Sequence, residues 1–165
     1  MEMSWLISCA IVLHNLEEAI WLPAWSNEPK HWKKPLIAFE FRFATYTLSL
    51  VAIGLSIAIT FGIYPKICIP ILAGYSVAMI VNAIVPHLFL TLKTQSYMPG
   101  TATGLLMVLP TGVGFLGMLV GTHQMDISTI LVWGMGIGLG LLTSLPALFW
   151  VARAFQESFL LKNTR

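Results

Sequence analysis

The chain has 165 residues, of which 57% are hydrophobic and only 10% are charged, and its formal net charge at pH 7 is +2. Soluble globular domains carry about a quarter charged residues, so this composition excludes an ordinary soluble domain and predicts an all-α integral membrane protein. The few basic residues form no stripe, which argues against nucleic acid as a partner.

Five apolar runs are each long enough to cross a bilayer as a helix, because a span needs about 20 residues. In chain order these spans cover roughly 3–22, 36–62, 67–92, 103–121 and 127–152. A tight turn at Pro65 separates the second span from the third, and the last helix is expected to continue to about Leu161. The sequence therefore predicts a single domain, residues 1–165, built as a bundle of five transmembrane helices.

The lysines and arginines next to the spans predict the orientation of the bundle, since cytoplasmic loops carry an excess of these residues. Only Lys66 falls on one side of the predicted membrane. The residues on the other side are Lys30, Lys33, Lys34, Lys93, Arg153, Lys162 and Arg165. We therefore expect the N-terminus outside, the C-terminus in the cytoplasm and a multi-pass protein of the cell membrane.

The first span contains His14, Glu17 and Glu18 in the stretch VLHNLEEAIWLP. Their offsets of three and four residues predict that all three share one helix face. An acidic residue near the centre of a span costs about 2.5–3.5 kcal/mol, against a gain of about 0.3–0.6 kcal/mol for each Leu or Ile. Two glutamates therefore persist only if they face the bundle interior, pair, bind a cation or take a proton. A cluster that merely holds helices together is the alternative.

Other polar residues of the spans fall at a similar depth in the same leaflet. Glu40 and Arg42 are two residues apart, so they point to opposite sides of the second helix, and Arg42 suits an internal counter-ion or a contact to lipid phosphate. His87 follows Pro86, which frees a carbonyl and kinks the third helix. Asn82 and His87 are about 140° apart on an ideal helix, so they share a site only if the kink rotates one toward the other.

Glycines recur in the fourth and fifth spans. The stretch GVGFLG at 112–117 matches the letters of a dinucleotide-binding motif, but no predicted strand precedes it. Glycines four residues apart instead fit close contacts between membrane helices, within one chain or in a homo-oligomer. These pairs are Gly117/Gly121, Gly134/Gly138 and Gly136/Gly140.

The stretch YMPG at 97–100 suits a turn that has proline at its second corner and Gly100 at a position of positive φ. HNLEE at 14–18, a second histidine at His87, and YMPG resemble, in this order, the motifs of the HXXEE family of bacterial membrane proteins. The resemblance covers roughly residues 10–112. This family has no established activity, so the resemblance implies a bacterial inner-membrane protein and a site without naming a reaction. The implied site residues are His14, Glu17, Glu18, His87, Tyr97, Pro99 and Gly100.

Two histidines and a carboxylate suit a divalent metal with water in an open position, with zinc favoured and iron the alternative. We expect a metal-dependent, hydrolytic enzyme that acts on a lipid-like or other hydrophobic substrate in the cytoplasmic leaflet. The expected metal ligands are His14, Glu17, Glu18, His87 and Glu40. The expected catalytic residues are Glu17, Glu18 and Tyr97, and the expected substrate contacts are Asn82, Arg42, Pro99 and Gly100.

Two other functions remain open. A metal-free isomerase or cyclase would use a protonated glutamate and a histidine on an apolar substrate. A transporter would also use buried acids and histidines, but the chain lacks an internal repeat, and the outer half of its spans is expected to be nearly all apolar. Tyr97 is a proton donor or lid in the two enzyme hypotheses. If its role is only structural, it anchors the loop at the membrane interface.

Overall fold

The structure is a computed structural model that describes residues 2–28 and 34–163, with side chains as far as residue 159. Every regular element within these ranges is helical. Five helices of the described chain are long and apolar enough to cross a membrane, which confirms the predicted number of spans. They are Glu2–Ser26, Ala38–Thr60, Pro65–Thr94, Thr101–Gly121 and Ile127–Phe159.

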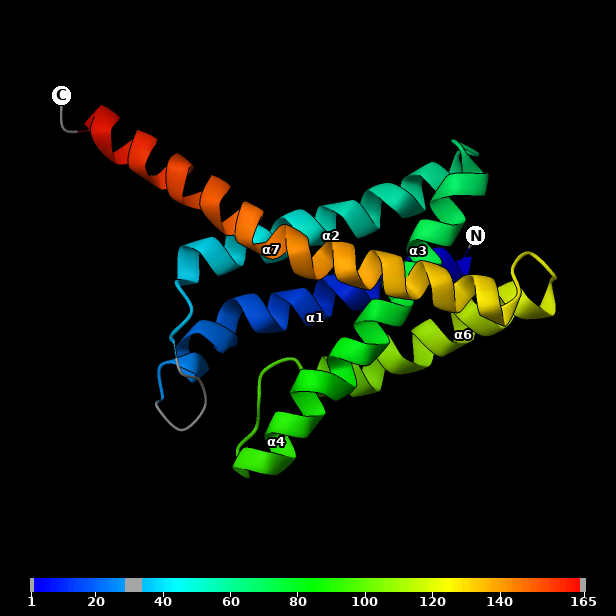
Figure 1. Cartoon of the computed structure of the whole chain (residues 1–165), viewed down its shortest axis with the longest axis horizontal. Coiled ribbons are helices and arrows are strands. Elements are labelled where there is room, and N and C mark those ends of the chain that lie inside the picture. The colour runs from blue at the N-terminus through cyan, green and yellow to red at the C-terminus, as the bar shows by residue number, and fades with distance from the viewer. Residues whose placement is uncertain (1, 29–33, 164–165) are drawn as a thin grey trace.

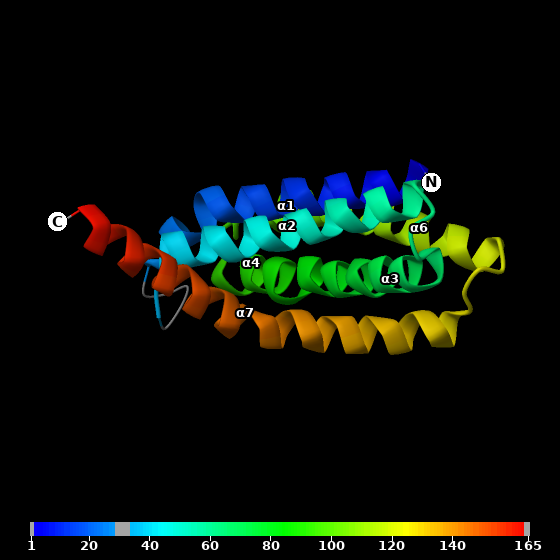
Figure 2. The ribbon, with the colours of Figure 1, turned by 90° about the horizontal axis from the view of Figure 1, so that it is seen from above.

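The first two helices, α1 (Glu2–Ser26) and α2 (Ala38–Thr60), run side by side (Figures 1 and 2). Serines line their contact: Ser8 Oγ donates to the Ala52 carbonyl at 2.9 Å, and Ser56 Oγ donates to the Ser4 carbonyl at 2.8 Å. Small residues allow the two backbones to approach, and the serine hydroxyl of each helix donates to a backbone carbonyl of the other helix. The half of the bundle near the N-terminus, expected to be nearly all apolar, therefore contains a buried polar seam.

The third span is broken at Pro86. The helix α3 (Pro65–Asn82), which begins at the predicted turn, leads into a π-helical segment, η1 (Ala83–Leu88), and then into α4 (Phe89–Thr94). Val85 has a non-helical backbone with φ −127° and ψ 110°, and the Val85–Pro86 peptide is cis. Proline removes a helical hydrogen bond and clashes with the preceding turn, and π-bulges are frequent at functional sites. The predicted kink is confirmed.

A loop at residues 95–100 leads into the fourth span, which consists of α5 (Thr101–Thr103), the π-helical η2 (Gly104–Val108) and α6 (Leu109–Gly121). Gly100 has a φ of +97°, as the YMPG turn predicts. This run packs against α1 and against the broken third span. The loop and η2 thereby lie beside the part of α1 that contains the HNLEE stretch.

The last helix, α7 (Ile127–Asn163), continues without a break past the predicted end of its span. It packs against α3 and α2, and its C-terminal part projects beyond the bundle (Figures 1 and 2). A Cβ at Gly134 would lie 2.6 Å from Val77 Cγ1, so this glycine permits close packing on α3. Within the predicted glycine pairs, no described atom lies within 4 Å of such a Cβ at Gly117, Gly121, Gly136 or Gly140. Oligomerisation through them stays a prediction.

The orientation of the bundle also stays a prediction. The two described ends of the chain lie at opposite ends of the molecule (Figure 1). Among the charges that predict the orientation, Lys30, Lys33 and Arg165 lie outside the described residues, as does the side chain of Lys162. The positive-inside argument therefore depends on the sequence alone.

Candidate functional site

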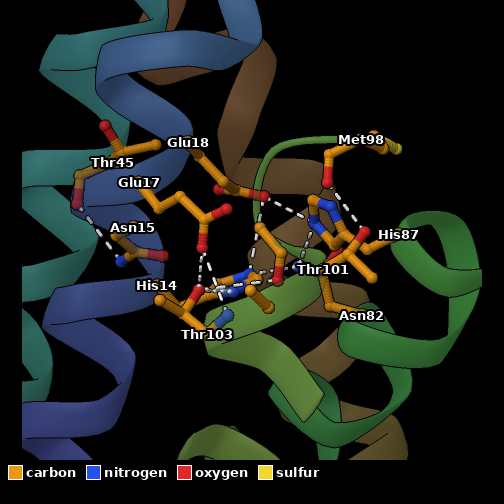
Figure 3. Close-up of polar contacts among 12 residues, drawn as sticks. His14, Asn15, Glu17, Glu18, Thr45, Asn82, His87, Met98, Thr101 and Thr103 are labelled. Atoms are coloured by element: carbon orange, nitrogen blue, oxygen red, sulfur yellow. Dashed lines mark hydrogen bonds and ion pairs between the residues drawn. The ribbon is translucent and has the colours of Figure 1, made fainter. Parts of the chain in front are cut away.

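Helix α1 and the π-helical segment bring a buried His/Glu group together (Figure 3). His14 and Glu18 lie one turn apart on α1, and His87 comes from η1. Asn82 Nδ2 lies 3.1 Å from His14 Nε2 and 3.1 Å from His87 Nε2. The break at Pro86 therefore meets the condition under which Asn82 and His87 share a site.

The three ionisable side chains of this group are close enough to share one ion. Glu18 Oε1 lies 2.6 Å from His87 Nε2 and 3.5 Å from His14 Nε2. One ligand atom from each residue lies within 4.8 Å of the others, and the two histidines are no more than 1% exposed. Two imidazoles and one carboxylate are a donor set that zinc uses in proteins. The group could therefore hold a metal ion, as the sequence predicts.

Glu17, Tyr97 and Thr103 form a second hydrogen-bonded set next to the first, called the Glu17 set below. Its Oε2 accepts from Thr103 Oγ1 at 2.6 Å and from the Thr103 backbone N–H at 3.2 Å, and its Oε1 accepts from the Tyr97 hydroxyl. Thr103 Oγ1 also lies 3.2 Å from His14 Nδ1. Because the threonine proton goes to Glu17, its oxygen is free to accept from a protonated His14 Nδ1. This assignment leaves the lone pair of His14 on Nε2, facing Glu18.

His14, Glu17 and Glu18 share one buried face of α1, as predicted, but the two glutamates point to different sides of His14. Consecutive residues on a helix point about 100° apart, so the two glutamates lie on either side of His14. Glu18 turns toward His87, whereas Glu17 turns toward the Tyr97 loop and Thr103. The two glutamates therefore have different neighbours and different possible roles.

Glu40 and Arg42 lie outside this group. Glu40 Oε1 pairs with Arg153 Nε of α7 at 2.8 Å, and Arg42 Nε donates to the Ala19 carbonyl of α1 at 2.9 Å. The prediction that the two point to different neighbours is confirmed. The predicted ligand set is corrected, because Glu40 pairs with Arg153 and is not part of the His/Glu group.

The YMPG loop closes the site from one side. A Cβ at Gly100 would lie 2.6 Å from His87 Cε1, 2.7 Å from His87 Nδ1 and 3.0 Å from His14 Cε1. Gly100 also has a φ of +97°, which L side chains rarely adopt. Glycine at this position is therefore required both by the backbone and by the two imidazole rings.

An apolar groove of about 760 Å³ lies next to Glu17. Its walls come from one face of α1, the YMPG loop and the start of the fourth span. The lining residues are Leu13, Leu16, Glu17, Ile20, Trp21, Trp25, Tyr97, Pro99, Thr103 and Met107. Glu17 and Tyr97 thus connect the groove to the hydrogen bonds around His14.

Sequence reasoning missed Thr103 and Asn15. Asn15, between the motif residues of HNLEE, is buried and donates to Ser49 Oγ of α2 at 3.0 Å. Thr103 links Glu17 to His14, but nothing in the stretch TATG distinguishes it from Thr101, whose hydroxyl donates to the Met98 carbonyl at 2.7 Å. A polar residue at the start of a helix is common, so the sequence contained no specific signal for the role of Thr103.

Burial and the hydrogen bond to Glu17 raise the pKa of the Tyr97 hydroxyl above its usual value of about 10. A raised folded-state pKa stabilises the fold at pH values below about 10, and this contribution is lost as the pH rises through the folded pKa. We expect the Tyr97→Phe variant to lose less stability than the wild type between about pH 10 and the higher pH at which Tyr97 ionises in the folded chain. Denaturant midpoints in detergent against pH measure this difference. Identical alkaline slopes would contradict it.

The site lies within a stretch of the chain that matches a known protein family. A family model described as "Protein of unknown function with HXXEE motif" matches residues 5–115, a range that contains every residue of the His/Glu group and of the Glu17 set. The uncharacterized protein YrkK of Bacillus subtilis (strain 168) is 37% identical over 147 residues, which are 86% of this chain and 90% of that protein. No solved structure matches the chain.

Proposed function

The chain belongs to the HXXEE family, whose function is not established, and we propose that it is a membrane-embedded, metal-dependent hydrolase acting on a lipid-like substrate. The observation that carries the proposal is the buried group of His14, Glu18 and His87. Catalytic zinc sites use three protein ligands of these types and keep a further position open. When bound, the metal would lower the pKa of a water molecule and polarise the scissile carbonyl.

The donor atoms suit a cation better than they suit one another. His87 Nε2 faces both Glu18 Oε1 and Asn82 Nδ2. A ring nitrogen offers either one proton or one lone pair, so it cannot donate to Glu18 and accept from Asn82 in the same state. A cation would use the lone pairs of both histidines together with the carboxylate. The Thr103 hydroxyl beside His14 Nδ1 supports this arrangement, because ligating histidines are usually oriented through their other nitrogen.

The residues of the Glu17 set handle protons in this proposal. Glu17 lines the groove and accepts the proton of the attacking water as general base. Tyr97 retains its proton at neutral pH, since its pKa is raised, and it donates to the oxygen that gains charge or to the leaving group. The substrate's apolar part lies in the groove, along the wall that contains Pro99.

The metal and the location are further parts of the proposal. Zinc is favoured over iron, because di-iron centres in helix bundles use two Glu-x-x-His motifs and additional carboxylates from four helices. The asymmetry of lysines and arginines supports a site in the cytoplasmic leaflet of a bacterial inner membrane. Five helices long enough to cross a bilayer are consistent with that placement.

Separate substitutions of the two glutamates test the division of roles. We expect Glu18→Gln to lose the metal, and Glu17→Gln to keep it while losing hydrolysis by about 10²-fold or more, as for removal of a general base. Zinc content is measured by elemental analysis, and hydrolysis by mass spectrometry of products from long-chain esters and amides in proteoliposomes. Glu157→Gln, at an exposed position of α7, is the matched control. A zinc-loaded wild type that cleaves none of these lipids would contradict the proposed reaction.

A metal-free isomerase or cyclase is the second candidate. The contact of 2.6 Å between His87 Nε2 and Glu18 Oε1 favours it, because a proton can pass directly between a histidine and a carboxylate at this distance. Proton transfer within the pair would then act on an apolar substrate. A folded wild type that retains no metal after purification and zinc loading would select this candidate. Transport remains the least supported function. The buried hydroxyls of Ser8 and Ser56 already donate to backbone carbonyls, so they hold α1 and α2 together rather than offering a path for an ion.

A further inference from the structure

The groove beside Glu17 opens on the surface that a membrane-spanning bundle presents to lipid. Its α1 wall contains Leu13, Leu16 and Ile20, at helical spacing, and these side chains are 40%, 40% and 44% exposed. Exposed apolar side chains in the middle of a span contact lipid chains. A molecule can therefore reach the groove sideways from the bilayer without crossing water.

The polar part of the groove is confined to one place. Among the described residues that line it, Glu17 is the only charged one, and Tyr97 and Thr103 add hydroxyl groups next to it. An anionic head group would meet the Glu17 carboxylate with no lining cation to compensate for the repulsion. An uncharged head group can instead join the hydrogen bonds around Glu17 and Tyr97.

We propose that the groove binds one uncharged long-chain lipid, a fatty alcohol or an ester of one, with its polar end at Glu17 and Tyr97. Its chain lies against Leu13, Leu16 and Ile20. A volume of about 760 Å³ falls within the range of pockets that enclose a small molecule. The identification of this lipid as the substrate rests on the proposed hydrolase function, whereas its binding does not require the metal.

Trp21 and Trp25 line the groove and report on its occupancy, because bromine quenches indole fluorescence on contact. The full chain is placed in unbrominated phosphatidylcholine vesicles, and a dibrominated fatty alcohol is added at increasing mole fraction. We expect saturable quenching that disappears in the Trp21→Phe, Trp25→Phe double variant. A dibrominated alkyl sulfate of the same chain length, which is always anionic, should need about tenfold more to reach the same quenching.

Three variants make the test specific. Leu16→Phe, which fills the groove, should abolish the saturable quenching, whereas Leu131→Phe, at an exposed position of α7, should not. Glu17→Gln should bring the alkyl sulfate to within about twofold of the alcohol, because it removes the charge that repels the sulfate. Loss of the tenfold preference in Glu17→Gln would support the assigned role of the carboxylate, and an unchanged preference would contradict it.

Quenching that is linear with mole fraction and equal for alcohol and sulfate would overturn the proposal, since it describes contact with bulk lipid. Zinc content is measured in the same samples and separates the two proposals. Saturable alcohol binding by a chain that takes up no zinc would contradict the hydrolase and support the groove site. Stoichiometric zinc without saturable quenching would contradict the groove site alone.

Discussion

The His87→Ala variant is expected to lose metal binding, from about one ion per chain in the zinc-loaded wild type to background. His87 Nε2 is 2.6 Å from Glu18 Oε1, and its removal leaves one imidazole and one carboxylate, too few for a tight zinc site. The measurement is elemental analysis of detergent-purified protein after loading with zinc and removal of the excess. His14→Ala should have the same effect.

The matched control is His123→Ala, because His123 is an exposed histidine in the loop between α6 and α7. It should retain the metal. Circular dichroism and gel filtration establish that each variant is folded. If alanine at position 87 prevents folding, His87→Gln keeps a polar side chain of similar length and gives the same test. Equal zinc content in the wild type and a folded His87 variant would contradict the assigned ligand.

Gly100→Ala is expected to weaken zinc binding by about 10–100-fold and to destabilise the chain, although position 100 supplies no ligand. The left-handed backbone alone costs about 1–2 kcal/mol for an L residue. The added Cβ also meets His87 Cε1 at 2.6 Å and His14 Cε1 at 3.0 Å, so both rings must move. Zinc affinity by competition with a chelator, and denaturant midpoints in detergent, measure the two effects.

Gly62→Ala separates these two causes. Gly62 also has a positive φ, +68°, but no described atom lies within 4 Å of the Cβ that alanine would add. This variant should therefore lose about 1–2 kcal/mol of stability and keep its zinc affinity. If both alanine variants bound zinc equally well, contact between Gly100 and the histidines would not control the geometry of the site.

The five helices could be predicted because burial in lipid is a property of whole runs of residues, and run length alone identifies a span. The kink could be predicted from Pro86. The cost of placing ionisable residues in hydrocarbon indicates His14, Glu18 and His87, although the predicted set also includes Glu17 and Glu40. The spans and the kink depend on local sequence. The histidines and glutamates are costly inside a span, so their positions alone indicate a site. The structure confirms a His/Glu/His group at this place.

Other features depend on lateral neighbours, which a single sequence does not specify. The sequence predicts Glu40 at a depth similar to that of the histidines, yet it pairs with Arg153 of α7. Nearby Arg42 is level with Ala19 rather than with His14. Glu17 is separated from Glu18 by its bond to Thr103, which depends on where the YMPG loop places the fourth span. The serine seam was missed because a single hydroxyl costs little in a span, so averaged hydropathy does not reveal it.

The amide of Asn82 contacts the nitrogens through which both histidines would bind a metal. A cation bound to these two lone pairs would displace both contacts, so the side chain of Asn82 would have to move. The Asn82 amide and a metal ion would therefore compete for the same two ring nitrogens. The position of the Asn82 side chain would then report whether an ion is bound.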